Sequence, residues 1–113
     1  MEKQAITKYV RISAFKAREL SRLIQDMPVQ EAFAFLEFTP RKGGRLIGKT
    51  LKSAVANAEN DPNWHVSKED LYVKRAEIGE GPTMKRQRPK ARGMAGKIRR
   101  RTSHIKIVVA QKN

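Results

Sequence analysis

The chain has 113 residues, no cysteine and a formal net charge of +14. This length predicts one domain with a small hydrophobic core, and the lack of cysteine excludes disulfides and thiolate metal sites. No apolar run approaches the roughly 20 residues of a membrane-spanning helix, and the N-terminal residues MEKQAITKYV lack the apolar core of a signal peptide. These features favour a soluble intracellular protein, and the charge predicts an anionic partner.

The first part of the chain predicts a strand followed by two helices. Apolar residues alternate weakly over Lys3–Val10, which indicates a short edge strand. Ser13 is a typical N-cap for a helix over Ala14–Met27. Pro28 suits the first turn of a second helix, whose apolar face falls within residues 29–36.

A third helix carries the clearest amphipathic pattern in the chain. Thr39-Pro40 provides a cap and first-turn signal, and an apolar stripe follows over residues 47–58. Gly43 and Gly44 weaken the first turn by roughly 1 kcal/mol each relative to Ala. The helix is predicted to end at the breaker formed by residues 60–63.

The C-terminal half predicts two strands, Leu71–Ile78 and His104–Ala110. Apolar residues share one face of the second strand. In the first strand the apolar residues change parity between Val73 and Ala76, which predicts a bulge or a strong twist.

Few single residues suggest a stacking, metal-binding or catalytic role. Trp64 is interpreted as a loop anchor on the core, with base stacking as the alternative. His65 and His104 lie far apart without supporting ligands, so no metal site is predicted. No phosphate-binding loop, paired carboxylates or nucleophile constellation is present, and we expect neither an enzyme nor a cofactor.

The segment Gly81–His104 carries nine basic residues and no acid, and it accounts for +9 of the net charge against +5 for the rest. Because it joins two strands, residues 79–104 are predicted to form a β-hairpin arm with its turn near Pro89–Gly93. At ~3.3 Å per residue the tip would stand on the order of 30–35 Å beyond the body. Since an isolated two-stranded ribbon is marginal in water, we expect the arm to become ordered on binding a polyanion.

The composition of the arm predicts binding to phosphate rather than to bases. A solvated tail is the alternative, but tails lie at chain ends, whereas this segment is held between strands. Its many arginines suit bidentate phosphate contacts, and its lack of Phe, Tyr and Trp argues against base stacking. Each phosphate contact would add roughly −0.7 to −0.9 to the slope of log affinity against log salt.

A second basic group lies near predicted helix starts, where free N–H groups bind phosphate. It includes Arg41 and Arg45, and for each member an ordinary solvated helix surface is an equal alternative. With the arm, the candidate RNA-binding residues are Arg11, Ser13, Lys16, Arg18, Lys42, Lys49, Lys85, Arg86, Arg88, Lys90, Arg92, Lys97, Arg99, Arg100, Arg101, Thr102, Ser103 and His104.

Three stretches of the chain are similar to a known family. They are SAVANAE at residues 53–59, EGPTMKR at residues 80–86 and RRTSHI at residues 100–105, the last two joined through Pro89–Gly93. Over essentially its full length the chain resembles the bacterial large-subunit ribosomal protein L twenty-two family.

The resemblance implies an α+β fold, with three helices packed on a small three-stranded antiparallel sheet and a long protruding hairpin arm. It implies a structural, non-catalytic constituent of the large ribosomal subunit in the cytoplasm, which binds large-subunit rRNA as a monomer and aids assembly; an organellar ribosome is left open. The arm would line the nascent-peptide exit tunnel, near the macrolide-binding region, beside ribosomal protein L four and the nascent peptide. The residues at its tip would be Met84, Lys85, Arg86, Gln87, Arg88, Pro89, Lys90, Ala91, Arg92 and Gly93.

The chain departs from the family pattern at three places. Met94 stands where members often have a basic residue, which removes one expected phosphate contact. Gly43-Gly44 replaces a more helix-favouring pair, so we expect that helix start to fray or to lie closer to RNA. Gln87 and Arg88 make the tip more polar than usual.

An architectural DNA-binding protein with a minor-groove β-arm is the alternative function, with Pro89 as a wedge near the tip. A single arm needs a dimer to embrace DNA, and the sequence offers no clear dimer seam. A nuclease would need an acidic cluster, whereas Asp61, Glu69 and Asp70 are scattered near a turn. Composition does not separate these possibilities, and the resemblance favours the ribosomal protein.

Overall fold

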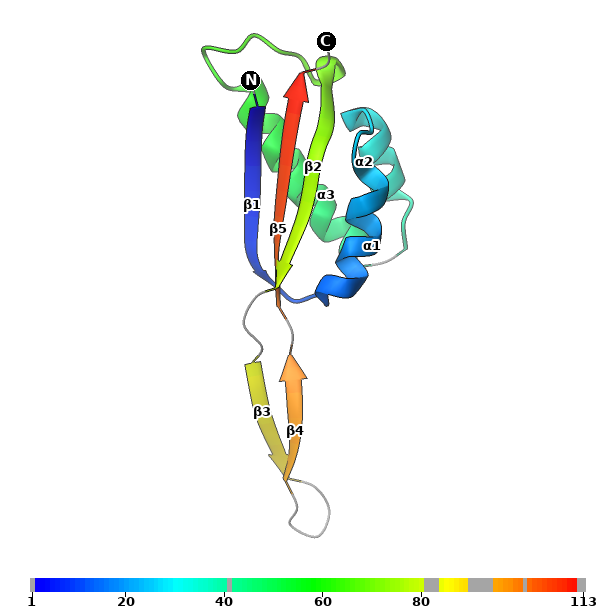
Figure 1. Cartoon of the computed structure of the whole chain (residues 1–113), viewed down its shortest axis with the longest axis vertical. Coiled ribbons are helices and arrows are strands. Elements are labelled where there is room, and N and C mark those ends of the chain that lie inside the picture. The colour runs from blue at the N-terminus through cyan, green and yellow to red at the C-terminus, as the bar shows by residue number, and fades with distance from the viewer. Residues whose placement is uncertain (1, 41, 81–83, 90–94, 101, 112–113) are drawn as a thin grey trace.

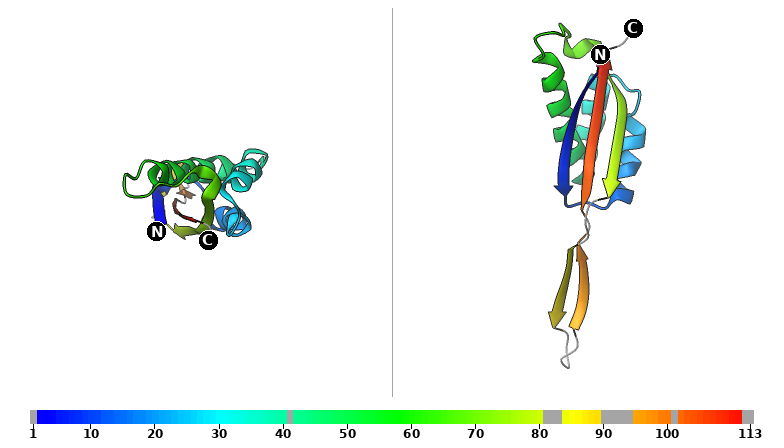
Figure 2. Two further views of the ribbon diagram at one scale, coloured as in Figure 1. Left: turned by 90° about the horizontal axis from the view of Figure 1, so that it is seen from above. Right: turned by 60° about the vertical axis from the view of Figure 1, so that its left-hand side comes forward.

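The structure, a computed structural model, describes residues 2–40, 42–80, 84–89, 95–100 and 102–111. Within them, an antiparallel sheet has the strand order β1-β5-β2, and three helices cover one face of it (Figures 1 and 2). This arrangement confirms the predicted α+β fold class. The elements of this body are β1 (Glu2–Val10), α1 (Ala14–Ile24), α2 (Val29–Glu37), α3 (Lys42–Glu59), a short 3-10 helix (Lys68–Asp70), β2 (Leu71–Glu80) and β5 (Ser103–Gln111).

A second antiparallel sheet of two strands, β3 (Met84–Pro89) and β4 (Ala95–Arg100), extends beyond one end of the body (Figure 1). The molecule measures 64 × 27 × 16 Å, and its radius of gyration of 17.3 Å exceeds the roughly 13 Å of a compact domain of this length. At the root, Glu80 pairs with Ser103. Most of the predicted tip turn, like Met94, lies outside the described residues.

Both edges of the three-stranded sheet contain an irregularity. The register between β2 and β5 shifts between Val73 and Arg75, which confirms the predicted bulge. The register between β1 and β5 shifts between Thr7 and Val10, and Tyr9 in this gap has a φ of 60°. A non-glycine residue with such a φ is uncommon and strained, so the surrounding structure must hold it there.

The first helix is shorter than predicted: it ends at Ile24 rather than Met27. Asp26 adopts a φ of 68°, and its N–H donates to the carbonyl of Val73 at 2.7 Å. The N–H of Val73 donates in turn to the carbonyl of Met27 at 2.9 Å. The segment leaves the helix because it pairs with the edge of β2, a tertiary contact that local periodicity does not contain.

The junction between α2 and α3 also differs from its sequence signals. Thr39 does not cap α3; its hydroxyl donates to the carbonyl of Phe35 at 2.7 Å and so stabilises the end of α2. The third helix then begins at Lys42 and runs to Glu59. Pro28 occupies the N-cap position of α2 rather than its first turn.

The core lies between the helices and the sheet. Ile107 of the central strand β5 is fully buried and pairs with Ala5 on one side and Ala76 on the other. The small partners leave room for Ile107 to reach the helices. Trp64 is buried as predicted for a loop anchor, and its indole N–H donates to Gln111 at 3.2 Å.

The paired glycines at the start of α3 are buried, and the helix is formed from Lys42 onward. A Cβ atom at Gly43 would lie 2.9 Å from the Cδ1 atom of Ile12, and one at Gly44 would lie 3.0 Å from the carbonyl oxygen of Leu36. The glycines therefore allow α3 to approach the start of α1 and the end of α2 closely. The glycines lower the helix propensity of this turn, and they permit the close packing of α3 on its neighbours.

This packing predicts opposite effects for two glycine substitutions in one helix. In Gly44→Ala, overpacking costs of about 1–3 kcal/mol exceed the propensity gain of roughly 1 kcal/mol, so the unfolding free energy falls by about 1 kcal/mol. A Cβ at Gly48 meets nothing within 4 Å, so Gly48→Ala raises it by up to about 1 kcal/mol. Urea unfolding followed by circular dichroism measures both, and equal stabilisation by the two substitutions would contradict the close packing.

Candidate nucleic-acid interface

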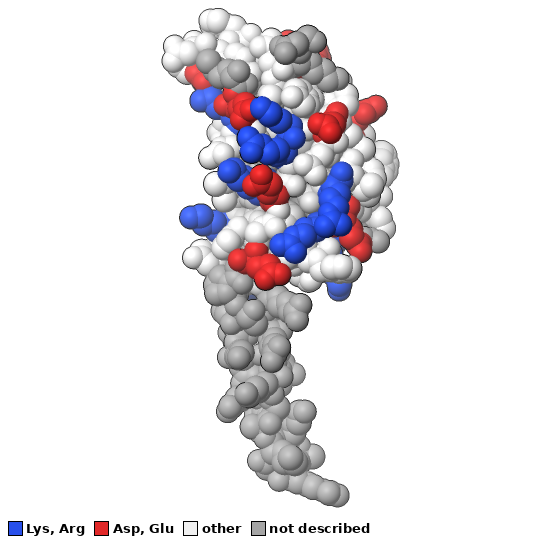
Figure 3. Space-filling view, viewed as in Figure 1, with Lys and Arg blue, Asp and Glu red and all other residues white. Residues whose placement is uncertain are grey.

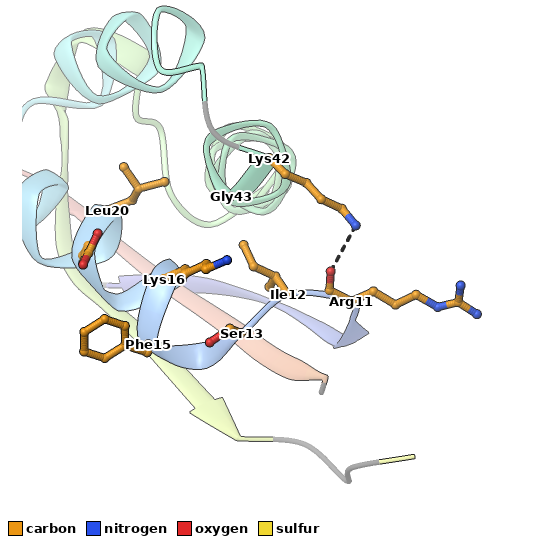
Figure 4. A pocket seen from close by; sticks show the side chains of 9 residues that line it. Arg11, Ile12, Ser13, Phe15, Lys16, Leu20, Lys42 and Gly43 are labelled. Carbon is orange, nitrogen blue, oxygen red and sulfur yellow. Dashed lines mark hydrogen bonds between the residues drawn. The ribbon is translucent and has the colours of Figure 1, made fainter. Parts of the chain in front are cut away.

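A pocket of about 660 Å³ lies between the start of α1 and the start of α3. Its apolar part includes Ile12, Leu20 and Gly43, and Phe15 adds an aromatic ring (Figure 4). The start of α1 lies at the end of the body from which the β3–β4 ribbon extends (Figure 1). Its charged lining residues are Arg11, Lys16, Lys42 and Glu19.

The turn between β1 and α1 fixes the pocket's entrance. The N–H of Ile12 donates to the carbonyl of Val10 at 2.9 Å, and the carbonyl of Ile12 accepts from the Ser103 hydroxyl at 2.7 Å. Ser13 occupies the N-cap position as predicted, but its side chain makes no capping hydrogen bond. Unsatisfied N–H groups at a helix start favour an anion nearby.

Lys42 joins the start of α3 to the turn before α1. Its ammonium donates to the carbonyl of Arg11 at 3.1 Å, drawn as the dashed line in Figure 4. The bond uses one of the three ammonium donors, so two donors remain. Arg11 and Lys16 are exposed, and no ion pair joins either of them to an acid in the described part of the chain.

Two other predicted residues lie apart from this group. Arg18 is partly buried, and its guanidinium donates to the carbonyl of Ile78 at 3.1 and 3.3 Å, which ties α1 to β2. Lys49 lines a separate hollow of about 440 Å³ between α2 and α3, together with Arg45 and Lys52. Lys52 was missing from the predicted sites, although the spacing i, i+4, i+7 places these three residues on one helix face.

The open face of the sheet has a different character, because two of its cations, Lys74 and Arg75, are paired with an acid. Figure 3 shows basic and acidic residues intermixed there. Glu2 forms ion pairs with Lys74 and, at 3.7 Å, with Arg75, and the hydrogen bond from Lys74 lowers the pKa of the Glu2 carboxyl. At the sheet's edge Lys3 pairs with Asp61 at 2.8 Å. These cations are less available to phosphate than those of the pocket.

The residues where the arm returns to the body are mostly engaged within the protein. Thr102 and Ser103 are buried. The Nδ1 atom of His104 accepts the N–H of Tyr9 at 3.1 Å, and the two rings meet edge to face with centroids 5.0 Å apart. The sequence indicated only a strand position for Tyr9, yet its ring is 64% exposed.

The arm cations are described through the pairing of their strands. Lys85 pairs with Arg99 across the ribbon, and Met84 pairs with Arg100. Lys90, Arg92 and Arg101 lie outside the described residues.

Other kinds of site find no support in the described residues. They contain no cluster of three or more His, Cys, Asp and Glu side chains placed to hold a metal ion. No helix among them has the length and hydrophobicity needed to cross a membrane.

A small α+β body with a projecting β-ribbon, together with cations that have no acid partner in the described part of the chain, defines a small basic protein with an arm. The comparisons with known proteins give the family. Residues 5–110 match the ribosomal protein L22p/L17e family, and the chain belongs to it.

Relatives align over nearly their whole length. A protein of Halothermothrix orenii is 53% identical over 112 residues, covering 99% of this chain and 97% of that protein. One of Ligilactobacillus salivarius is 56% identical over 109 residues, covering 96% and 93%. One of Chloroflexus aggregans is 46% identical over 113 residues, covering 100% and 98%. Each is named large ribosomal subunit protein uL22.

Family membership confirms three sequence-based expectations. The predicted family is correct, and it is a structural family of the large ribosomal subunit rather than an enzyme family. The individual RNA-binding residues stay predictions.

Proposed function

We propose that this protein is a structural constituent of the large ribosomal subunit that binds large-subunit rRNA through its arm and the basic end of its body. The observation that carries the proposal is the placement of cations that have no acid partner among the described residues. Arg11, Lys16 and Lys42 line one pocket between the starts of α1 and α3, whereas Lys74 and Arg75 on the sheet are paired with an acid. The arm and the pocket can therefore contact one continuous RNA surface.

The finer parts of the proposal rest on the family resemblance. The arm would run between rRNA segments and line the nascent-peptide exit tunnel, with residues 84–93 at its tip. Ribosomal protein L four and the nascent peptide would be its neighbours there, and the protein would bring rRNA segments together during assembly. The relatives are bacterial proteins of the large subunit, so the location is the ribosome in the cytoplasm.

The proposal predicts which cations contribute to RNA binding. The measurement is the affinity of the whole protein for a large-subunit rRNA transcript over a series of salt concentrations. Lys42→Gln should flatten the slope of log affinity against log salt by about 0.7–0.9, because one phosphate contact is lost. Lys74→Gln removes the same charge from the sheet, where Glu2 already pairs with it, and should leave the slope nearly unchanged.

Two outcomes would contradict the proposal. One is complete loss of the protein from large subunits in a salt wash of moderate strength. The other is preferential binding of duplex DNA over rRNA in direct competition, which would favour the architectural DNA-binding alternative.

A further inference from the structure

An exposed aromatic ring lies in the basic pocket. Phe15 in the first turn of α1 is 72% exposed and lines the cavity together with Ile12 and Leu20. Apolar patches rimmed by polar residues often mark binding sites, and Phe15 lines the same pocket as Ile12 and Leu20. The segment that supplies most of the chain's charge has no aromatic residue, so this ring provides a kind of contact that the arm cannot make.

We propose that the pocket binds one unstacked nucleotide of the rRNA. Its base would pack against Phe15 and the apolar floor, and its phosphates would contact Lys16, Lys42 and Arg11. The inference rests on the proposed rRNA binding and specifies how the body takes part in it. The arm would follow the RNA backbone, and the body would hold a single base.

The floor of the pocket is built by close packing of the two helix starts. Gly43 has no side chain, and a Cβ there would lie 2.9 Å from Ile12 and 3.1 Å from Leu20. The backbone of α3 therefore meets these side chains directly, and their contact closes the bottom of the pocket. The volume of about 660 Å³ falls within the roughly 300–1,000 Å³ typical of sites for small organic ligands, which is enough for a nucleotide.

Charge favours RNA over a protein segment as the occupant. The lining contains three basic residues and one acid. The Lys42 ammonium lies beside the Arg11 carbonyl, at the pocket, where its remaining donors can face a phosphate. An apolar peptide would leave these cations without counter-charge. A nucleotide would place its base against the Phe15 ring and its phosphates against the cations.

Two exposed phenylalanines allow a matched test. Phe38 is 83% exposed at the end of α2 and does not line the pocket. Loss of one base–aromatic contact weakens single-stranded binding by about 5- to 150-fold. We therefore expect Phe15→Ala to lower the affinity for a large-subunit rRNA transcript by such a factor, Phe15→Tyr to retain most of it, and Phe38→Ala to change little.

The salt dependence separates a stacking contact from a charge contact. Phe15→Ala should leave the slope of log affinity against log salt unchanged, because no charge is removed. Circular dichroism and urea unfolding of each variant check that the body stays folded. Equal affinities of Phe15→Ala and wild type would overturn the inference, as would an equal loss in Phe38→Ala.

Photo-cross-linking gives an independent readout. With p-benzoylphenylalanine at position 15, irradiation of protein bound in the large subunit should give a cross-link to one unpaired rRNA nucleotide. A cross-link from position 15 to a neighbouring protein instead would overturn the inference. Failure of the wild-type protein to bind the transcript would refute the proposed function itself, whereas normal wild-type binding with a silent Phe15→Ala would refute only the nucleotide pocket.

Discussion

Deletion of residues 84–100 is expected to leave a folded body that has lost most of its affinity for rRNA. The deletion removes both strands of the ribbon and leaves residues 81–83 and 101–102 to connect Glu80 with Ser103, which already pair. A connection of this length is common in hairpins. In the described structure the core cluster is drawn from residues 5–78 and 105–109, so the helices and the three-stranded sheet keep their packing.

The loss in RNA binding follows from charge. The deleted segment contains eight basic residues and no acid, and each phosphate contact contributes about 0.7–0.9 to the salt slope. If most of these residues contact phosphate, the slope flattens by as much as about 6. Filter binding to a large-subunit rRNA transcript at several salt concentrations measures the change, and circular dichroism monitors the body.

Two results would contradict this expectation in different ways. Loss of the helical signal would mean that the ribbon is required for the body to fold. A folded variant with the wild-type salt slope would mean that the cations of the body, rather than those of the arm, dominate RNA binding.

The elements of the fold were predictable from sequence where local pattern and tertiary structure agree. Alternation predicted all three strands of the body, and the parity change after Val73 predicted the bulge at the residue where the register shifts. Helical spacing predicted α3 because its apolar stripe is continuous. The predicted end of α1 was wrong, because residues 25–27 leave the helix to pair with β2, a contact between segments far apart in the chain.

The candidate site was predictable in charge but not in shape. Basic residues at two helix starts indicated phosphate binding, yet nothing in the sequence placed Arg11 and Lys42 at the same pocket. Gly43 brings the two segments together, because it allows α3 to pack directly on Ile12. From sequence alone, however, a glycine in the first turn of a helix indicates only lower helix stability. Phe15 was likewise hidden, because an apolar residue in an amphipathic helix is usually assigned to the core.

Ile107→Ala is expected to cost about 2–5 kcal/mol of unfolding free energy, the range for truncation of a buried Ile or Leu. Ile107 is fully buried in the central strand, and its strand neighbours on both sides, Ala5 and Ala76, are small. They cannot extend into the cavity, so the cost should lie toward the upper end. Ile6→Ala is the matched control: Ile6 is 47% exposed on the edge strand, and its truncation should cost about 1 kcal/mol or less. Urea unfolding at fixed temperature compares the two.

The Ile107→Ala variant also tests whether RNA binding depends on the packing of the core. Since the cations lie in the arm and at the basic end of the body, the folded fraction of Ile107→Ala should bind rRNA with wild-type affinity. A ligand that binds only the folded state at 100 times its Kd adds about 2.7 kcal/mol of stability, so excess rRNA should restore much of what the cavity removes. Thermal unfolding with and without the transcript measures this recovery. A weaker intrinsic affinity of the folded variant would mean instead that the central strand positions the RNA-binding residues as well as the core.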